Sequence, residues 1–151
     1  MSGESKKIVL SSDHAGYEMK EMVKKYLLEL GLIVEDVSSE KLDPLDDYPE
    51  YGFKLAKKVA RKEFERGILL CGSGIGASIA ANRFKGVRAA LCTSVEHARL
   101  ARLHNDSNVL VIGGRTTTFE TVKEMIRTWL SQQFEGGRHQ RRVDQLDTFG
   151  E

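Results

Sequence analysis

The chain has little cysteine and almost no excess charge. Only two of its 151 residues are cysteines, Cys71 and Cys92, and 23 Lys and Arg against 22 Asp and Glu give a formal net charge of +1. Two thiols cannot form the disulfide framework of a small secreted domain, and they lack the Cys-x-x-Cys spacing of redox and zinc sites. A nearly neutral chain also has no long-range field that attracts nucleic acid or a membrane surface. We therefore expect neither as a partner.

Long hydrophobic runs are also missing. The longest ones, such as residues 109–112, are far too short to span a bilayer, and the charged residues 1–7 precede no apolar signal core. We expect a cytoplasmic protein that does not contact a membrane. Because 40% of the residues are hydrophobic, a chain of this length can bury one core of normal size. We predict a single domain over residues 1–151.

The apolar residues that are present follow two patterns. Short continuous runs predict five buried strands, at residues 8–11, 32–37, 67–71, 87–92 and 109–112. Apolar residues three or four positions apart predict helices at residues 19–30, 53–60, 76–83, 95–104 and 119–130. Buried strands that alternate with helices are typical of an α/β fold with a mainly parallel sheet covered on both faces. We predict a loop at residues 38–49 and a polar tail at residues 136–151, which lies over the domain or over a neighbour.

Several side chains with useful chemistry follow the predicted strands. Asp13 and His14 come after the first strand, residues 71–76 come after the third, and Arg115 comes after the fifth. Sheets of this kind bind ligands at the carboxyl ends of their strands. We therefore expect these residues to border a ligand site.

Residues 71–76, Cys-Gly-Ser-Gly-Ile-Gly, form a glycine-rich turn between a strand and a helix. Such a turn can direct backbone N–H groups at an anion, although glycines also serve close packing alone. No Lys-Ser or Lys-Thr pair follows, which excludes a Walker loop, and the glycine spacing on a third strand disfavours a dinucleotide site. A helix N-terminus stabilises a thiolate, so Cys71 is a candidate base or nucleophile. We interpret Cys92, inside a strand, as a buried apolar residue.

Histidines and arginines supply candidate proton-transfer and phosphate-binding groups. His14, and His104 with Asn105 beside it, could transfer a proton or donate to a phosphate; the alternative is a surface or capping role. A basic cluster near the C-terminus could bind a phosphomonoester through guanidinium groups. One alternative is a solvated tail. The other is a nucleic-acid patch, but the lack of interleaved aromatics disfavours it. The cluster consists of Arg138, His139, Arg141 and Arg142.

Six unrelated motifs occur together in one order along the chain. They are Ser12-Asp13-His14-Ala15-Gly16, Asp47-Tyr48-Pro49, residues 67–76, Ser78-Ile79-Ala80-Ala81-Asn82, His104-Asn105-Asp106 and Gly136-Gly137-Arg138-His139. In order and spacing they resemble the type B ribose-5-phosphate isomerases, over about residues 8–143. That family also includes galactose-6-phosphate isomerase subunits and allose-6-phosphate isomerases, so the resemblance indicates the reaction type better than the sugar.

The resemblance implies a fold, an assembly and a reaction. The fold is a three-layer α/β/α sandwich of Rossmann-like topology, and the protein is active without a metal or another cofactor. The assembly is a homodimer or a dimer of dimers, with sites at the subunit interface. The reaction interconverts ribose 5-phosphate and ribulose 5-phosphate. Alternatives are a hexose 6-phosphate isomerase and a non-catalytic phosphosugar-binding subunit, and the acidic loop at residues 38–49 leaves the sugar length open.

The resemblance also implies catalytic roles. Cys71 is the base that moves a proton between C1 and C2 through an enediolate, and Ser73 relays the hydroxyl proton. His104, assisted by Asp13, opens the furanose ring. A variant of the family uses a later glutamate as the base, but Ala77 stands at that place here.

The remaining residues implied by the resemblance bind the substrate. Backbone groups of the glycine-rich turn, with Asn105, hold the oxyanion. Tyr48 lines the site, and one histidine and three arginines bind the phosphate. These substrate-binding residues are Gly72, Gly74, Gly76, Asn105, Tyr48, His14, Arg115, Arg138 and Arg142.

Overall fold

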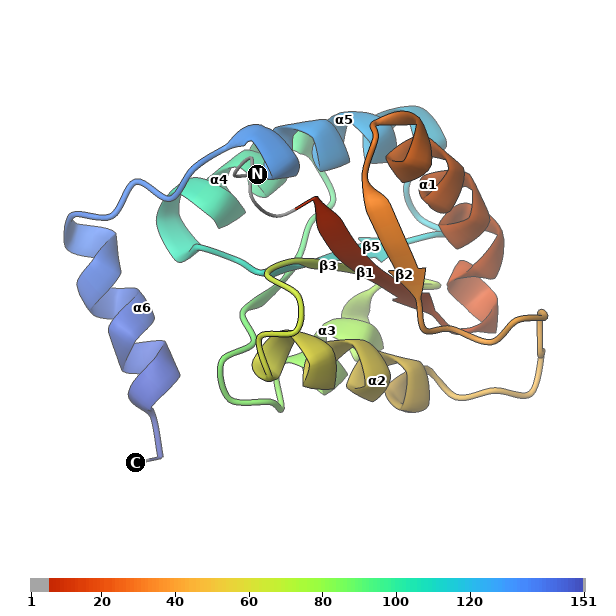
Figure 1. Cartoon of the computed structure of the whole chain (residues 1–151), viewed down its shortest axis with the longest axis horizontal. Helices are drawn as coiled ribbons and strands as arrows, with labels where there is room; N and C mark the ends of the chain where they lie inside the picture. The colour runs from red at the N-terminus through yellow and green to blue at the C-terminus, as the bar shows by residue number, and fades with distance from the viewer. Residues whose placement is uncertain (1–5, 151) are drawn as a thin grey trace.

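The structure is a computed structural model that describes residues 6–150. Within this range strands and helices alternate along the chain (Figure 1). The strands are β1 (Lys7–Ser12), β2 (Ile33–Asp36), β3 (Gly67–Cys71), β4 (Ala89–Leu91) and β5 (Val109–Gly113). The helices are a short 3-10 turn η1 (His14–Gly16), α1 (Tyr17–Glu29), α2 (Tyr48–Ala60), α3 (Ile75–Ala81), α4 (Val95–Asn105), α5 (Phe119–Ser131) and α6 (Arg138–Thr148).

All of these strands pair in parallel in one sheet, in the order β2-β1-β3-β5-β4. The chain moves outward from β1 to β2 and then returns to β3 on the other side of β1. The direction of winding therefore reverses between β1 and β3, which is the topological switch point where open α/β sheets bind ligands. The residues after β1 and β3 meet at that point.

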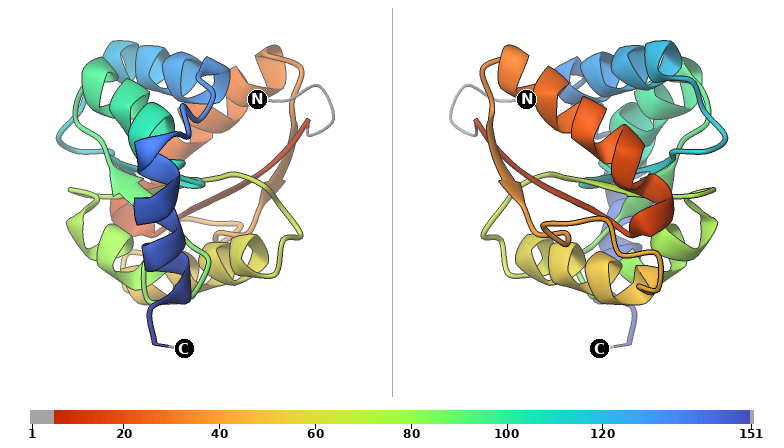
Figure 2. Two further views of the ribbon diagram at one scale, coloured as in Figure 1. Left: turned by 90° about the vertical axis from the view of Figure 1, so that its left-hand side faces the viewer. Right: turned by 90° about the vertical axis from the view of Figure 1, so that its right-hand side faces the viewer.

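Alternate residues of the strands enter two separate cores, as the pleat of a strand requires. One core packs the sheet against α1, α4 and α5, and the other packs it against α2 and α3 (Figure 2). In β3, for example, Leu70 belongs to the first core, and Leu69 and Cys71 belong to the second. Both faces of the sheet are covered, so the predicted three-layer α/β/α sandwich is confirmed.

The segment predicted as a polar tail contains a helix, α6, which the sequence analysis missed. This helix lies at one side of the molecule, opposite the loop that joins β2 to α2 (Figure 1). His139 and Val143, four residues apart, are its buried side chains. Two inward positions among many charged residues are a weak helical signal, which explains the miss. The last predicted helix at residues 119–130 is therefore followed by another.

Several boundaries also differ from the predictions by one or more residues, and that of α2 differs most. Helix α2 begins at Tyr48, so the predicted loop ends earlier, and Pro49 stands in the first turn, where its missing N–H costs nothing. Strand β4, at the edge of the sheet, is shorter than predicted and covers only Ala89–Leu91. No helix within residues 6–150 has both the length and the apolar character to cross a bilayer.

Candidate active site

Cys71 is the last residue of β3 and lies at the switch point. The residue is 6% exposed, and its Sγ accepts a hydrogen bond from the backbone N–H of Gly74 at 3.1 Å. Gly74 has a φ of +83°, and a Cβ there would approach Leu91 Cδ1 to 2.5 Å, so only glycine fits this turn. The next residue, Ile75, begins α3 and donates its N–H to Ser73 Oγ at 3.2 Å. The sulfur therefore lies in a turn whose N–H groups can stabilise negative charge.

Tyr48 covers the start of α3. A Cβ at Gly76 would lie 2.6 Å from the Tyr48 ring, so the ring can occupy this place only because residue 76 has no side chain. Tyr48 remains 41% exposed. It thus forms one wall beside the turn.

The end of β1 packs closely against this turn. A Cβ at Gly72 would contact Ala15 Cβ at 3.3 Å and Arg115 Cδ at 3.7 Å, and the Arg115 N–H donates to Gly72 O at 2.9 Å. His14 and Arg115 together border a cleft of about 240 Å³. Its other lining residues are Ala15, Glu18, Met19, Leu42, Pro44 and Gly114.

Asp13 and Cys92 have structural surroundings. The Asp13 carboxylate is buried and accepts the N–H of Gly16 at 3.0 Å, so it caps the η1 turn. Burial raises the pKa of the Cys92 thiol to about 12. Cys92 therefore stays protonated at neutral pH, in agreement with its interpretation as a buried apolar residue.

His104 and Asn105 lie at the amino ends of the strands, whereas Cys71 lies at the carboxyl ends. They end α4 and lie just before Val109, the first residue of β5. Cys71, by contrast, pairs with Gly113, the last residue of β5. Four residues of strand separate the two levels by roughly 13 Å. Arg138 and Arg142 lie on α6 at this same far side (Figure 1). One chain therefore does not bring His104, Asn105, Arg138 or Arg142 to the turn that holds Cys71.

The far group has its own organisation. The His104 ring stacks on the His139 ring with centroids 4.2 Å apart and planes inclined by 15°. His139 is 5% exposed, and its Nε2 has no hydrogen-bond partner within residues 6–150. Burial lowers the pKa of His139, and the charge of Arg138 lowers it further. A neutral His139 ring thus supports the face of His104.

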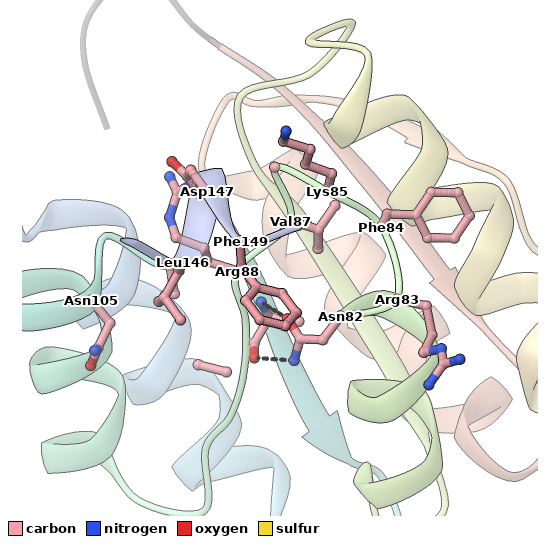
Figure 3. Close-up of a pocket in the computed structure, with 14 residues that line it drawn as sticks. Asn82, Arg83, Phe84, Lys85, Val87, Arg88, Asn105, Leu146, Asp147 and Phe149 are labelled. Atoms are coloured by element: carbon pink, nitrogen blue, oxygen red, sulfur yellow. Dashed lines mark hydrogen bonds and ion pairs between the residues drawn. The ribbon is translucent and has the colours of Figure 1, made fainter. Parts of the chain in front are cut away.

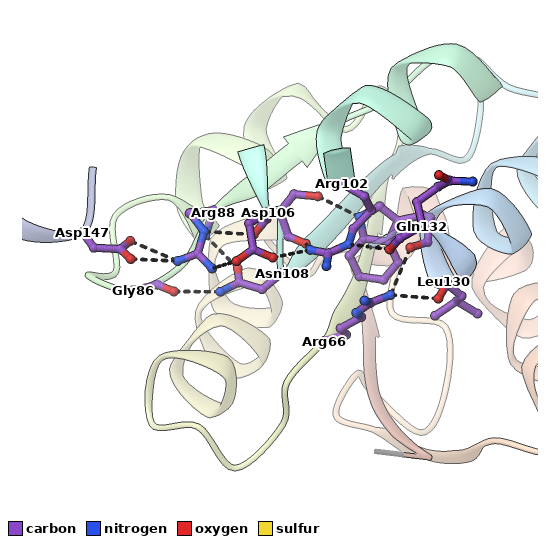
Figure 4. A network of polar contacts seen from close by, with 11 residues as sticks. Arg66, Gly86, Arg88, Arg102, Asp106, Asn108, Leu130, Gln132 and Asp147 are labelled. Atoms are coloured by element: carbon purple, nitrogen blue, oxygen red, sulfur yellow. Dashed lines mark hydrogen bonds and ion pairs between the residues drawn. The ribbon is translucent and has the colours of Figure 1, made fainter. Parts of the chain in front are cut away.

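A polar network fastens α6 and the end of α4 to the sheet (Figure 4). Arg88 donates to both Asp147 carboxylate oxygens at 3.0 and 3.2 Å, and its Nε donates to Asp106 O at 2.9 Å. Arg102 donates to Asp106 Oδ1 at 2.8 Å and to Ser107 O at 2.7 Å. Asp147 belongs to α6 and Asp106 caps α4. The network therefore ties the end of α4, which carries His104, to α6 through Asp147.

A groove of about 670 Å³ also opens at this far edge, between α6 and the segment from Asn82 to Ala90 (Figure 3). Asn82 bonds the backbone of Ala89 in both directions, at 2.8 and 2.9 Å, and this shapes the wall of the groove. Asn105 lines it, but no residue of the turn at 71–76 does. The groove is thus separate from the cysteine site.

Two groups within residues 6–150 bring three possible metal ligands within 4.8 Å of one another. In the group His104, Glu135 and His139, the stacked rings are nearly parallel, whereas one zinc ion needs two ring nitrogens that converge at about 2.0 Å. The second group is Asp13, His14 and Asp46. There Asp46 Oδ1 already accepts the backbone N–H of His14 at 2.9 Å and faces His14 Nδ1 at 2.8 Å. Hydrogen bonds and stacking account for both groups.

The structure therefore brings together nine of the thirteen expected site residues and sets the other four apart. Asp13, His14, Tyr48, the turn from Cys71 to Gly76 and Arg115 gather at the switch point. Two residues with contacts in the site were not among the candidates. Asp46 lies in the acidic loop, and its only sequence signal was the acid content of that loop; His139 was noticed only as part of the basic cluster.

The fold and this half-site define a doubly wound α/β domain with a cysteine and a glycine-rich turn at its switch point, next to a cleft lined by a histidine and an arginine. The sequence profile described as Ribose/Galactose Isomerase matches residues 8–146, and the chain belongs to this family. The chain is 44% identical over 144 residues to ribose-5-phosphate isomerase B of Escherichia coli (strain K12), covering 93% of this chain and 94% of that protein. The resemblance to type B ribose-5-phosphate isomerases is thereby confirmed.

Solved structures agree with this relationship. The ribose 5-phosphate isomerase of Thermotoga maritima is 48% identical, with a TM-score of 0.90 over 93% of this chain and 97% of that one. Ribose-5-phosphate isomerase B of Mycoplasma genitalium, solved with bound ribulose-5-phosphate, is 39% identical, with a TM-score of 0.91 over 95% of each chain.

Proposed function

We propose that this chain is an aldose–ketose isomerase that interconverts ribose 5-phosphate and ribulose 5-phosphate. The observation that carries the proposal is the Cys71 sulfur at the switch point, bonded to the Gly74 N–H and adjoining the cleft of His14 and Arg115. A basic atom, an oxyanion-stabilising turn and a phosphate-binding cleft are the groups that such an isomerisation needs. The names of the relatives and the ribulose-5-phosphate bound to the Mycoplasma genitalium protein support the same substrate.

In the proposed mechanism Cys71 acts as a base on the open-chain sugar. The thiolate takes the proton from C2 of the aldose, and the electron pair moves toward the carbonyl to form an enediolate. The backbone N–H groups of the turn stabilise its negative oxygen. The proton then returns from sulfur to C1, while Ser73 moves the hydroxyl proton from O2 to O1. Each proton removed is restored, so no further reactant is needed.

We further propose that a second copy of the chain completes each site. His104, Asn105, Arg138 and Arg142 lie too far from Cys71 in one chain to act on the same sugar, but a homodimer related by a two-fold axis can bring them to the partner's turn. Exposed apolar side chains near the turn support such a contact. They are Tyr48, Phe53, Ile75 and Ile79, each more than 40% exposed. A partner surface on this face would bury them.

In this assembly His104 opens the furanose ring, with Asp13 of the other chain beside it, and the two arginines of α6 join His14 and Arg115 around the phosphate. Neither metal nor another cofactor takes part in the proposed steps.

The cytoplasmic location expected from the sequence stays a prediction, which cell fractionation tests.

The assay that tests the proposal follows ketose formation by the purified protein in the presence of a chelator. Ribose 5-phosphate, allose 6-phosphate and galactose 6-phosphate are run in parallel. We expect turnover of ribose 5-phosphate with the highest kcat/KM. Higher efficiency on either hexose phosphate would reassign the substrate, and binding without turnover on all three would instead indicate a phosphosugar-binding subunit.

A further inference from the structure

One carboxylate of the loop between β2 and α2, that of Asp46, contacts His14. Asp46 Oδ1 accepts the backbone N–H of His14 at 2.9 Å and lies 2.8 Å from its Nδ1, across 32 residues of sequence. The Asp46 side chain is only 4% exposed, whereas the His14 side chain is 31% exposed. The other acids of this loop, Glu40, Asp43 and Asp47, are exposed. The contact with His14 therefore distinguishes Asp46 from its neighbours.

A buried carboxylate on a loop requires partners that offset its lost hydration. Within residues 6–150 His14 is the residue that supplies hydrogen bonds to Asp46, through both its backbone and its ring. The same loop contributes Leu42 and Pro44 to the cleft that His14 and Arg115 line. Asp46 thus connects the wall of the cleft to one of the cleft's own polar groups.

The contact also fixes the proton on the His14 ring. An ionised carboxylate only accepts hydrogen bonds, so Nδ1 must carry a proton in both charge states of the ring. The neutral ring then has a lone pair on Nε2, and only the imidazolium can donate from Nε2 to a phosphate oxygen. Whether His14 helps or opposes binding of a phosphate therefore depends on its charge.

We propose that Asp46 is a positioning residue of the phosphate subsite, which orients His14 and holds it as the imidazolium that donates from Nε2 to the phosphate of the sugar. This inference rests on the proposed function of the cleft. It extends the site by a residue from the acidic loop and gives that loop a role in substrate affinity.

The charges around His14 support the proposal. The hydrogen bond from Asp46 raises the pKa of His14 above its ordinary value, burial opposes this rise, and the charge of Asp13 adds to it. Glu18 of α1 and Arg115 after β5 are the other charged residues that line the cleft. Because the pKa is raised, the imidazolium persists to higher pH than in a free histidine and is lost only as the pH rises through the raised pKa.

The test compares Asp46→Asn with the wild type in kinetics on ribose 5-phosphate at pH 6 and pH 8. Asparagine keeps an oxygen that can accept both hydrogen bonds but removes the charge. At pH 8 we expect KM to rise by about tenfold, the loss of one charge-assisted hydrogen bond, with kcat within about twofold. Lower pH favours the imidazolium in both proteins, so at pH 6 the ratio of the two KM values should move close to one. Substrate ionisation cancels in this ratio.

Asp43→Asn is the matched control, because it removes the same charge from the same loop. Asp43 Oδ1 accepts the Leu45 N–H at 3.0 Å, and Asp43 has no hydrogen bond to His14. We expect its KM to stay at the wild-type value at both pH values. An equal rise in the two variants would overturn the proposal, because it would indicate a general effect of loop charge.

Two readouts separate this inference from the proposed function. In NMR spectra of the protein alone, the ring nitrogens of His14 should show a proton on Nδ1, and Asp46→Asn should lower the pKa of His14. A wild type without turnover would refute the proposed function while leaving this NMR result intact. A KM ratio that is the same at pH 6 and pH 8, or an unchanged His14 titration, would overturn the proposed role of Asp46. Its contact with His14 would then only hold the loop in place.

Discussion

Replacing Cys71 with alanine is expected to lower kcat for ribose 5-phosphate by about 10²- to 10⁴-fold, the range that a positioned general base contributes. The substitution removes the atom that takes the C2 proton. Substrate binding should be largely preserved, because the phosphate-binding side chains and the backbone of the turn remain. Steady-state kinetics at several substrate concentrations, with thermal unfolding to check the fold, measures both effects.

The other cysteine provides the control. Cys92 faces the opposite core from Cys71, and burial raises its pKa to about 12, so it cannot serve as the base. Cys92→Ala should therefore keep kcat within about twofold of the wild type, even if it lowers stability. Full activity of Cys71→Ala would remove Cys71 from the mechanism.

Two inactive variants should restore activity when they are combined. We expect Cys71→Ala and His104→Ala to be nearly inactive alone if His104 must open the ring. In a mixed dimer one site receives an intact Cys71 from one chain and an intact His104 from the other, and the second site receives neither. After unfolding and refolding together, random pairing in a two-fold dimer gives about one quarter of wild-type activity. The assay on the refolded mixture measures this recovery.

The control pairs Cys71→Ala with His14→Ala, which alter the same half of the site. In that mixed dimer one site lacks Cys71 and the other lacks His14. Activity should therefore equal the mean of the two separate proteins. If the first mixture also stays at the mean, each chain must hold a complete site, and the proposed sharing between subunits would be wrong.

The sequence predicted the frame of the site because strand ends and glycine spacing are local signals. The run at residues 67–71 followed by Cys-Gly-Ser-Gly-Ile-Gly indicated a strand, a turn and a helix, and the structure places Cys71 at that junction. Asp13 and His14 were expected at the same edge for the same reason. The strand order that makes β1 and β3 neighbours is a property of the whole sheet and confirms this grouping.

Other features depend on contacts that no local pattern reveals. The bond from Asp46 to His14 depends on the path of an irregular loop, and the burial of His139 depends on where α6 docks. The family resemblance placed His104 in the same site as Cys71. Only the course of α4 back to the amino edge of the sheet reveals that one chain separates the two residues.

A crystal structure of Cys71→Ala with ribose 5-phosphate tests the proposed shared site most directly. We expect the sugar phosphate at the switch point, with C1 and C2 beside residue 71 and the phosphate against His14 and Arg115. Arg138 and Arg142 of a second copy should reach the same phosphate, and His104 of that copy should reach the sugar. A sugar phosphate bound elsewhere would contradict the proposed function, and a site made from one chain alone would contradict the sharing between subunits.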